Sequence, residues 1–181
     1  SQDVETDDSV LRQTSARLPW LLIGMLGGIG NSMILGNFDT TFAAHPEMAL
    51  YIPLIGGTGG NVGTQSSALV VQGLANSSLD ANNTWKQILK ESVVALINAT
   101  IISMLVYIYN FVRFGPTATV SYSVSLSLFA VVMFASIFGT LVPMTLEKLK
   151  IDPAIATGPF ISITNDIIGM MLYMGITVLL S

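Results

Sequence analysis

Five long apolar segments decide what this chain can fold into. Their bounds are residues 18–38, 51–75, 88–114, 120–146 and 155–180. A helix needs about 20 apolar residues to cross the hydrocarbon core of a bilayer, and each segment reaches that length. Only short polar joints separate them. We therefore predict an all-α integral membrane protein with five transmembrane helices and no separate soluble domain.

The charge content excludes several classes of function. Only 10% of the residues are charged, whereas a soluble domain has about 25%. Seven basic residues against eleven acidic ones leave no basic face for a nucleic acid. The chain has no Cys and a single His, His45, which excludes thiolate chemistry and argues against a His-ligated zinc or a Ser-His-Asp triad. We expect neither an enzyme nor a nucleic-acid-binding protein.

The basic residues predict an orientation in the membrane. If there are five spans, six of the seven lie on one side and only Arg113 lies on the other. Cytoplasmic loops carry the excess of Lys and Arg, so we expect the N-terminus inside and the C-terminus outside. Residues 1–17 would then form an acidic cytoplasmic leader, and residues 18–181 a transmembrane pore domain.

The second segment is unusually rich in glycine. Five glycines fall within the eight residues from Gly56 to Gly63. Small residues allow helices to pack closely, but an unwound or tightly packed stretch can also face a permeation path. The neighbouring Asn61 and Gln65 need polar partners at membrane depth, and packing alone does not require them. The pattern favours a permeation path.

One carboxylate lies deep in the fifth segment. Asp166 follows Ile155 by eleven residues, which is about 16 Å along a helix and near the bilayer midplane. No basic residue lies deep enough to pair with it. At 100° per residue, one face of this fifth helix carries Ile155, Pro159, Ser162, Asp166, Gly169 and Tyr173. Such a face is typical of the lining of a cation path. The alternative is a structural Asp that is hydrogen-bonded to Asn61 or Asn98 on a neighbouring helix.

The available ligands favour a hard cation. Mg²⁺ prefers oxygen atoms and is usually held through one or two carboxylates and water. One carboxylate per chain is few for a divalent ion, unless a twofold axis brings two copies of Asp166 together.

Several motifs together resemble the MgtE family of magnesium channels and their eukaryotic solute-carrier relatives. The glycine-rich segment reads PLIGGTGGNVGTQSSALVVQGLA from Pro53, and the fifth segment reads PFISITNDIIG from Pro159. Arg17-Leu-Pro-Trp, the joint from Trp85 to Glu91 and Asp152-Pro-Ala match in the same order. The resemblance covers residues 17–181.

The resemblance implies a homodimer in which the second and fifth spans line a pore at the twofold axis. Asp166 would recognise hydrated Mg²⁺, helped by the backbone carbonyl of Ser162. The other expected pore-lining residues are Gly59, Gly60, Asn61, Gln65, Pro159, Gly169 and Tyr173. We expect a multi-pass protein of the cell membrane, in particular a bacterial inner membrane. A cytosolic regulatory domain, as in bacterial members of the family, would be a further partner outside these 181 residues.

Two alternatives have distinct chemistry. A broader importer of Co²⁺, Mn²⁺ or Ni²⁺ is compatible with one ring of Asp side chains. An intramembrane aspartyl protease needs two carboxylates that share a proton, and the run from Gly56 to Gly63 contains no Asp. A non-conducting scaffold does not explain Asp166.

Overall fold

The chain is almost entirely helical. The computed structural model describes the backbone of residues 4–181 and the side chains of residues 4–155 and 157–181; this part contains no strand. The long helices are α1 (Val10–Gly36), α3 (Ile52–Ala75), α4 (Thr84–Phe114), α5 (Thr119–Lys148) and α6 (Pro159–Leu180). The short elements are α2 (Asp39–Ala44) and three 3₁₀ helices, Pro46–Tyr51, Ala81–Asn83 and Pro153–Thr157. The all-α prediction is confirmed.

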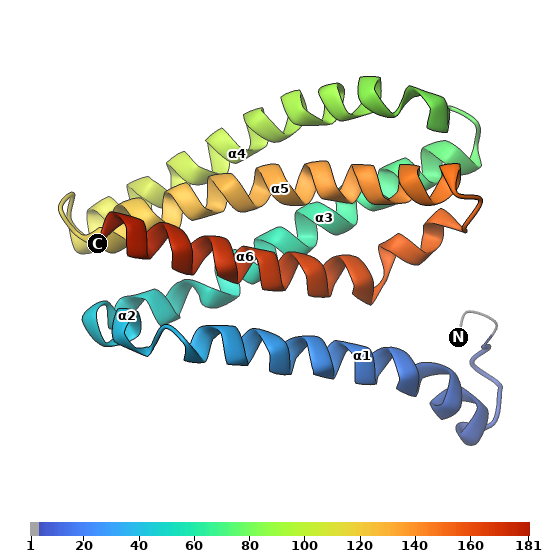
Figure 1. Cartoon of the computed structure of the whole chain (residues 1–181), viewed down its shortest axis with the longest axis horizontal. Helices are drawn as coiled ribbons and strands as arrows, with labels where there is room; N and C mark the ends of the chain where they lie inside the picture. Colours follow the sequence, from blue (N-terminus) through green and yellow to red (C-terminus); the bar gives the residue numbers. More distant parts are fainter. Residues whose placement is uncertain (1–3) are drawn as a thin grey trace.

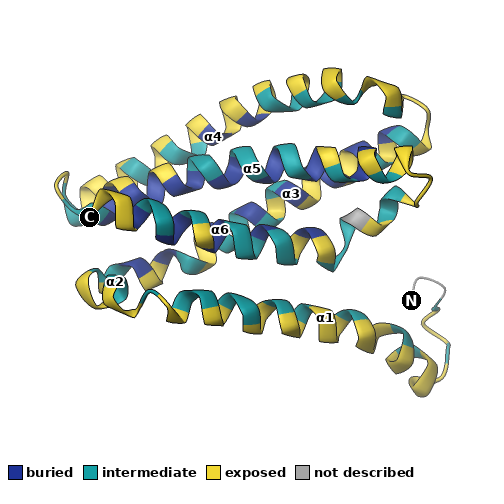
Figure 2. Ribbon diagram, in the orientation of Figure 1, coloured by how far each residue is buried: buried dark blue, intermediate teal, exposed yellow. Residues whose placement is uncertain are grey.

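The central helix of the bundle is α5, which packs against α3, α4 and α6. In Figure 1, α4 and α1 form opposite edges of the molecule, while α3 crosses obliquely behind α5 and α6. The edge helix α1 packs mainly on α6 and has no buried residue. Figure 2 shows the buried residues concentrated on α5 and the facing sides of its neighbours.

Four helices of the described part are long and apolar enough to cross a membrane: α1, α4 with the turn before it, α5 and α6. With 24 residues α3 is also long enough, but its glycine and amide residues make it less apolar than the other four. The chain is thus a multi-pass membrane protein by length and composition. A fifth span through α3 stays a prediction.

The glycine-rich segment is helical throughout, so of the two expected forms, unwound or tightly packed, the structure has the second. Glycine lowers helix stability by about 1 kcal/mol per residue relative to alanine. Close packing offsets this loss, because a Cβ atom at Gly59 would lie 2.8 Å from Val131 Cγ1 of α5. A Cβ atom at Gly63 would overlap the side chain of Asn165 of α6.

Two prolines that fall within the predicted segments lie in first helical turns. Pro53 is in the first turn of α3 and Pro159 begins α6, positions where the missing N–H has no helical partner anyway. Consequently α6 starts four residues after the predicted bound at Ile155, which belongs to the preceding 3₁₀ helix. Ile155 therefore drops out of the expected stripe on α6.

A buried cluster at one end of the bundle fixes the start of α3. It contains Met48 and Tyr51 of the 3₁₀ helix before α3, together with residues of α5 and α6. The Tyr173 hydroxyl donates a 2.8 Å hydrogen bond to the Met48 carbonyl, and the Tyr51 hydroxyl donates one to Asn110 Oδ1 of α4. These bonds attach the 3₁₀ helix before α3 to α6 and to α4.

Candidate cation site

A polar groove of about 440 Å³ lies where α1, α3 and α6 meet. Its lining residues are Asn31 of α1, Ile52, Gly56, Gly57, Gly60, Asn61 and Thr64 of α3, and Ser162, Asp166 and Met170 of α6. The walls therefore combine bare glycine backbone, amide and hydroxyl groups and a single carboxylate. No basic residue lines the groove.

The helical period divides the glycine run between two faces of α3. Gly56, Gly57 and Gly60 line the groove, whereas Gly59 and Gly63 are buried against α5 and α6. The sequence allowed two interpretations of the glycine run, close helix packing and the lining of a polar path. Each interpretation applies to a different set of glycines on the same helix.

Asp166 is half-buried on the α6 wall of the groove. A Cβ atom at Gly56 would lie 3.6 Å from Asp166 Oδ1, so the missing side chain lets the carboxylate lie close to the α3 backbone. Among the described residues, Asp166 has neither a hydrogen-bond partner nor an ion pair, and the alternative of a bond from Asn61 or Asn98 finds no support. The groove therefore holds a carboxyl group that has no bonding partner among the described residues.

The position of Asp166 within its helix differs from the expected one. It lies seven residues after the start of α6, about 10 Å along the helix axis rather than 16 Å. The 3₁₀ helix Pro153–Thr157 takes the place of the expected first helical turn and causes this difference.

Four of the predicted site residues meet in the groove: Asp166, Ser162, Asn61 and Gly60. Ser162 precedes Asp166 by one turn, and Met170 follows it by one turn. The groove face of α6 is thus the series Ser162, Asp166 and Met170, spaced by four residues.

The other predicted residues lie elsewhere. Gly169 is buried, and a Cβ atom there would lie 3.7 Å from Val131 Cγ2. Tyr173 is fully buried and bonded to Met48, and Gly59 faces Val131. Gln65 is exposed and Pro159 is half-buried, both outside the groove lining.

The sequence reasoning missed the contribution of α1. Asn31 lines the groove, and its Oδ1 atom is buried without a hydrogen-bond partner among the described residues. The available signal was an Asn that follows Gly-Gly-Ile-Gly in the middle of an apolar segment. An amide at such depth needs a polar neighbour, as Asn61 does.

The groove lacks the ligands of a closed metal site. No group of three or more Asp, Glu, His and Cys side chains that could hold a metal ion occurs in the described part of the chain. One carboxylate surrounded by neutral oxygen donors suits a hard cation that keeps most of its water. In a soft-metal site, sulfur or imidazole ligands would take these positions.

The fold and the groove define a multi-pass helical membrane protein with a polar groove that contains one carboxyl group. The sequence model of the MgtE family, described as a divalent cation transporter, matches residues 52–176. The chain belongs to this family, as the sequence motifs predicted. Its members are transporters and not enzymes, which removes the protease alternative.

Three relatives share this region, each named magnesium transporter MgtE. The chain is 31% identical over 175 residues to the protein of Bacillus subtilis, covering 97% of this chain and 39% of that protein. Identity to the Thermus thermophilus protein is 33% over 165 residues, covering 91% and 36%. Identity to the Enterococcus faecalis protein is 30% over 172 residues, covering 95% and 38%. The chain thus spans less than two-fifths of the length of each relative.

Proposed function

We propose that this chain moves Mg²⁺ across the membrane along the groove that contains Asp166. The observation that carries the proposal is an unpaired carboxylate in a polar groove between membrane helices. A charge at such depth is costly unless a counter-ion compensates it, and a passing cation provides that compensation. Membership of a divalent cation transporter family and three relatives named as magnesium transporters support the choice of ion.

The groove is half of the path in this proposal. Each protomer supplies one carboxylate, and Asn61, Thr64 and Ser162 are exposed along the groove. A homodimer with its twofold axis beside α3 and α6 would join two grooves and place two Asp166 side chains around one ion. A bacterial inner membrane with the N-terminus inside is the setting that we propose.

Hydrated Mg²⁺ is the species that this lining would recognise. Mg²⁺ gives up its water slowly, so a wide path with hydrogen-bonding walls is more suitable than a tight cage of ligands. The bare backbone at Gly56, Gly57 and Gly60 keeps the groove wide. Asp166 supplies the charge. The Ser162 carbonyl accepts hydrogen bonds from the water shell, and the Asn61 side-chain amide both accepts and donates them.

The remaining predicted residues have other roles in this proposal. Gly59, Gly169 and Tyr173 hold α3, α5 and α6 together behind the groove. Gln65 and Pro159 lie beyond its lining.

The decisive test is Mg²⁺ uptake by proteoliposomes that contain Asp166→Ala or Asp166→Asn. We expect Asp166→Ala to lower the uptake at least about 10-fold, because a charge-stabilising contact of more than 1.4 kcal/mol is lost. Asp39→Asn is the matched control, since it removes an exposed carboxylate in the short helix α2 and outside the groove. Size-exclusion chromatography and circular dichroism check that each variant stays folded. Normal uptake by Asp166→Ala would refute the proposed path.

A broader divalent importer is the second candidate. The groove offers one carboxylate and neutral oxygen donors, and recognition through a water shell depends weakly on the identity of the divalent ion. Competition of Mg²⁺ uptake by Co²⁺, Mn²⁺ and Ni²⁺ in the same proteoliposomes separates the two candidates. Equal inhibition by all three ions at Mg²⁺-like concentrations favours the broader importer.

A further inference from the structure

A second polar pocket lies at the joint between α3 and α4, at the edge of the bundle away from α1 (Figure 1). Its volume is about 210 Å³. The polar lining residues are Ser78, Asp80, Asn83, Lys86, Gln87 and Lys90. None of them belongs to the groove of Asp166, so this pocket needs a separate explanation.

The pocket presents two cationic side chains without carboxylate partners. Lys86 and Lys90 are exposed and one helical turn apart, and the described part of the chain has no ion pair for either. Asp80 Oδ1 accepts a 3.0 Å hydrogen bond from the Asn82 amide, which occupies that carboxylate oxygen in the turn. The neighbouring Glu91 accepts a 2.7 Å hydrogen bond from Ser66 of α3. With two lysines and one carboxylate in its lining, the pocket carries a net positive charge, which favours an anion.

The start of α4 adds to this preference. A long helix carries a partial positive charge at its N-terminus, and the 31-residue α4 begins at Thr84 beside the two lysines. The side chains of Ser78, Asn83 and Gln87 add hydrogen-bond donors around the same space. Charge and donors together match a phosphate group.

An apolar stripe runs from the lysines along the outer face of α4. It consists of Val93, Ile97, Ile101, Met104 and Ile108, each between 53% and 59% exposed. The spacing of three or four residues places all of them on the helix face of Lys86 and Lys90. Figure 2 shows exposed residues along the outer side of α4.

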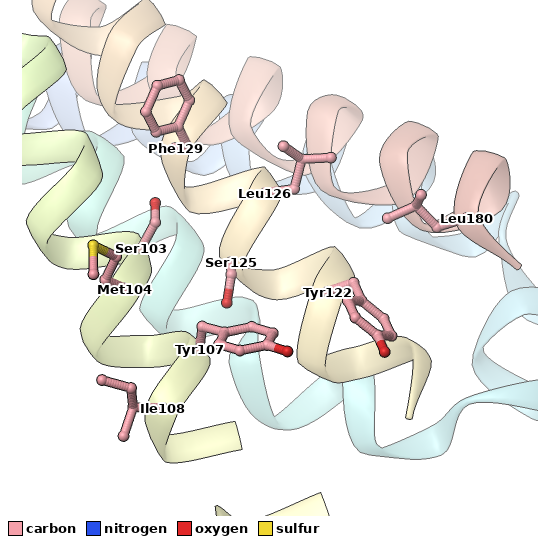
Figure 3. Close-up of a pocket in the computed structure, with 9 residues that line it drawn as sticks. All are labelled: Ser103, Met104, Tyr107, Ile108, Tyr122, Ser125, Leu126, Phe129 and Leu180. Carbon is pink, nitrogen blue, oxygen red and sulfur yellow. The ribbon is translucent and has the colours of Figure 1, made fainter. Parts of the chain in front are cut away.

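The part of the stripe that ends at Ile101 fits one leaflet of a bilayer. Eleven residues separate Lys90 from Ile101, which is about 16 Å along the helix, and one leaflet of the hydrocarbon core is about 15 Å thick. Trp85 is 72% exposed beside Lys86, as expected for an indole ring at the level of the headgroups. Farther along, Met104 and Ile108 line a separate apolar pocket with Tyr122 and Leu126 of α5 (Figure 3). A lipid acyl chain that begins at the level of the lysines and spans one leaflet would end before this second pocket.

We propose that the pocket at Lys86 and Lys90 binds an anionic phospholipid, with its acyl chains along the apolar stripe of α4. Basic pockets between membrane helices are suited to anionic headgroups, and each Lys near the surface adds attraction. The phosphate lies between the two ammonium groups, and the exposed stripe receives the acyl chains. A free phosphate ion would use the lysines but not the stripe. This site is independent of the path that we propose for Mg²⁺.

The test measures lipid binding to the purified full chain by native mass spectrometry, with phosphatidylglycerol and phosphatidylcholine as probes. We expect wild-type protein to prefer phosphatidylglycerol and the double variant Lys86→Gln/Lys90→Gln to lose about 30-fold of that preference. The matched control is Lys148→Gln/Lys150→Gln, which removes two exposed lysines at the end of α5. An unchanged preference in the first variant, or an equal loss in the control, overturns the site.

Inorganic phosphate distinguishes the lipid from a free anion. We expect Val93→Ser/Ile97→Ser to weaken phosphatidylglycerol binding and millimolar phosphate to leave that binding nearly unchanged. If phosphate alone binds and displaces the lipid, and the serine variant binds lipid like the wild type, the site is a phosphate site and the lipid proposal is wrong. Because both readouts are binding measurements, they stand or fall independently of Mg²⁺ uptake.

Discussion

The crossing of α3 and α5 gives the sharpest stability prediction, through the substitution Gly139→Ala. A Cβ atom at Gly139 would lie 2.7 Å from the backbone oxygen of Gly63 and 3.2 Å from Ser66 Cβ. The first distance is 0.7 Å short of the 3.4 Å at which ordinary van der Waals contact begins. A backbone oxygen in a helix cannot rotate away, so one of the two helices must shift.

The expected cost follows from three contributions. Overpacking of a close contact costs about 1–3 kcal/mol. Replacement of a helical glycine by alanine returns about 1 kcal/mol. The shift also weakens the 3.0 Å hydrogen bond from Ser67 Oγ to the Gly139 carbonyl, which contributes about 1 kcal/mol. We therefore expect Gly139→Ala to lower the free energy of unfolding by about 1–3 kcal/mol.

Unfolding by SDS in mixed micelles, followed by circular dichroism, measures this change. Gly24→Ala in α1 is the matched control, because a Cβ atom added there meets nothing within 4 Å outside the local helix backbone. The control should be neutral or up to about 1 kcal/mol more stable. If Gly139→Ala is as stable as Gly24→Ala, the helices are not in contact as described and the reasoning fails.

Three further predictions concern the groove, the buried end of the bundle and the topology. Gly60→Ala should lower Mg²⁺ uptake while leaving stability within about 1 kcal/mol of the wild type, because its Cβ meets no atom within 4 Å but enters the groove; normal uptake contradicts this. Tyr173→Phe should destabilise the protein by about 1 kcal/mol in the same SDS titration, since the buried Met48 carbonyl loses its 2.8 Å partner; an unchanged stability contradicts this. In whole cells, a membrane-impermeant thiol reagent should label Pro46→Cys and spare Ser78→Cys in this chain without native Cys, and the reverse pattern refutes the N-in orientation.

The apolar segments predicted the helices well because length and polarity alone determine where a helix can cross a bilayer. The predicted segments 88–114 and 120–146 differ by at most four residues from α4 (Thr84–Phe114) and α5 (Thr119–Lys148). Larger differences between a predicted segment and its helix occur where a local cap decides the helix boundary. Ser9 Oγ accepts a hydrogen bond from the Arg12 amide and begins α1 eight residues before the predicted span. Asp152 similarly caps the 3₁₀ helix that delays the start of α6.

The candidate site was predictable from the sequence where a polar residue lies within an apolar segment. It was less predictable where the rotation of the helix decides which residue faces the groove. Asp166 and Asn61 stand out because polar groups in a span need a partner. The sequence predicted that Gly169 lines the path next to Asp166, whereas Met170 lines the groove at that point. Residues three and four positions along a helix lie on opposite sides of a reference residue, separated by about 100°. Only the neighbouring helices determine which of the two faces the groove, and the sequence does not specify their positions.

The glycine run on α3 shows why its packing and its polar lining belong together. Gly59 and Gly63 bring α3 close to α5 and α6, while Gly57 and Gly60 leave space on the adjacent face. A helix of ordinary side chains could not do both, because bulk on the packing face would move α3 outward and bulk on the other face would fill the groove. The two kinds of glycine should therefore respond differently to a methyl group. Gly139→Ala, which presses on the packing face, should reduce stability first and transport as a consequence. Gly60→Ala should reduce transport with stability preserved, and this separation distinguishes a groove that conducts from one that only packs.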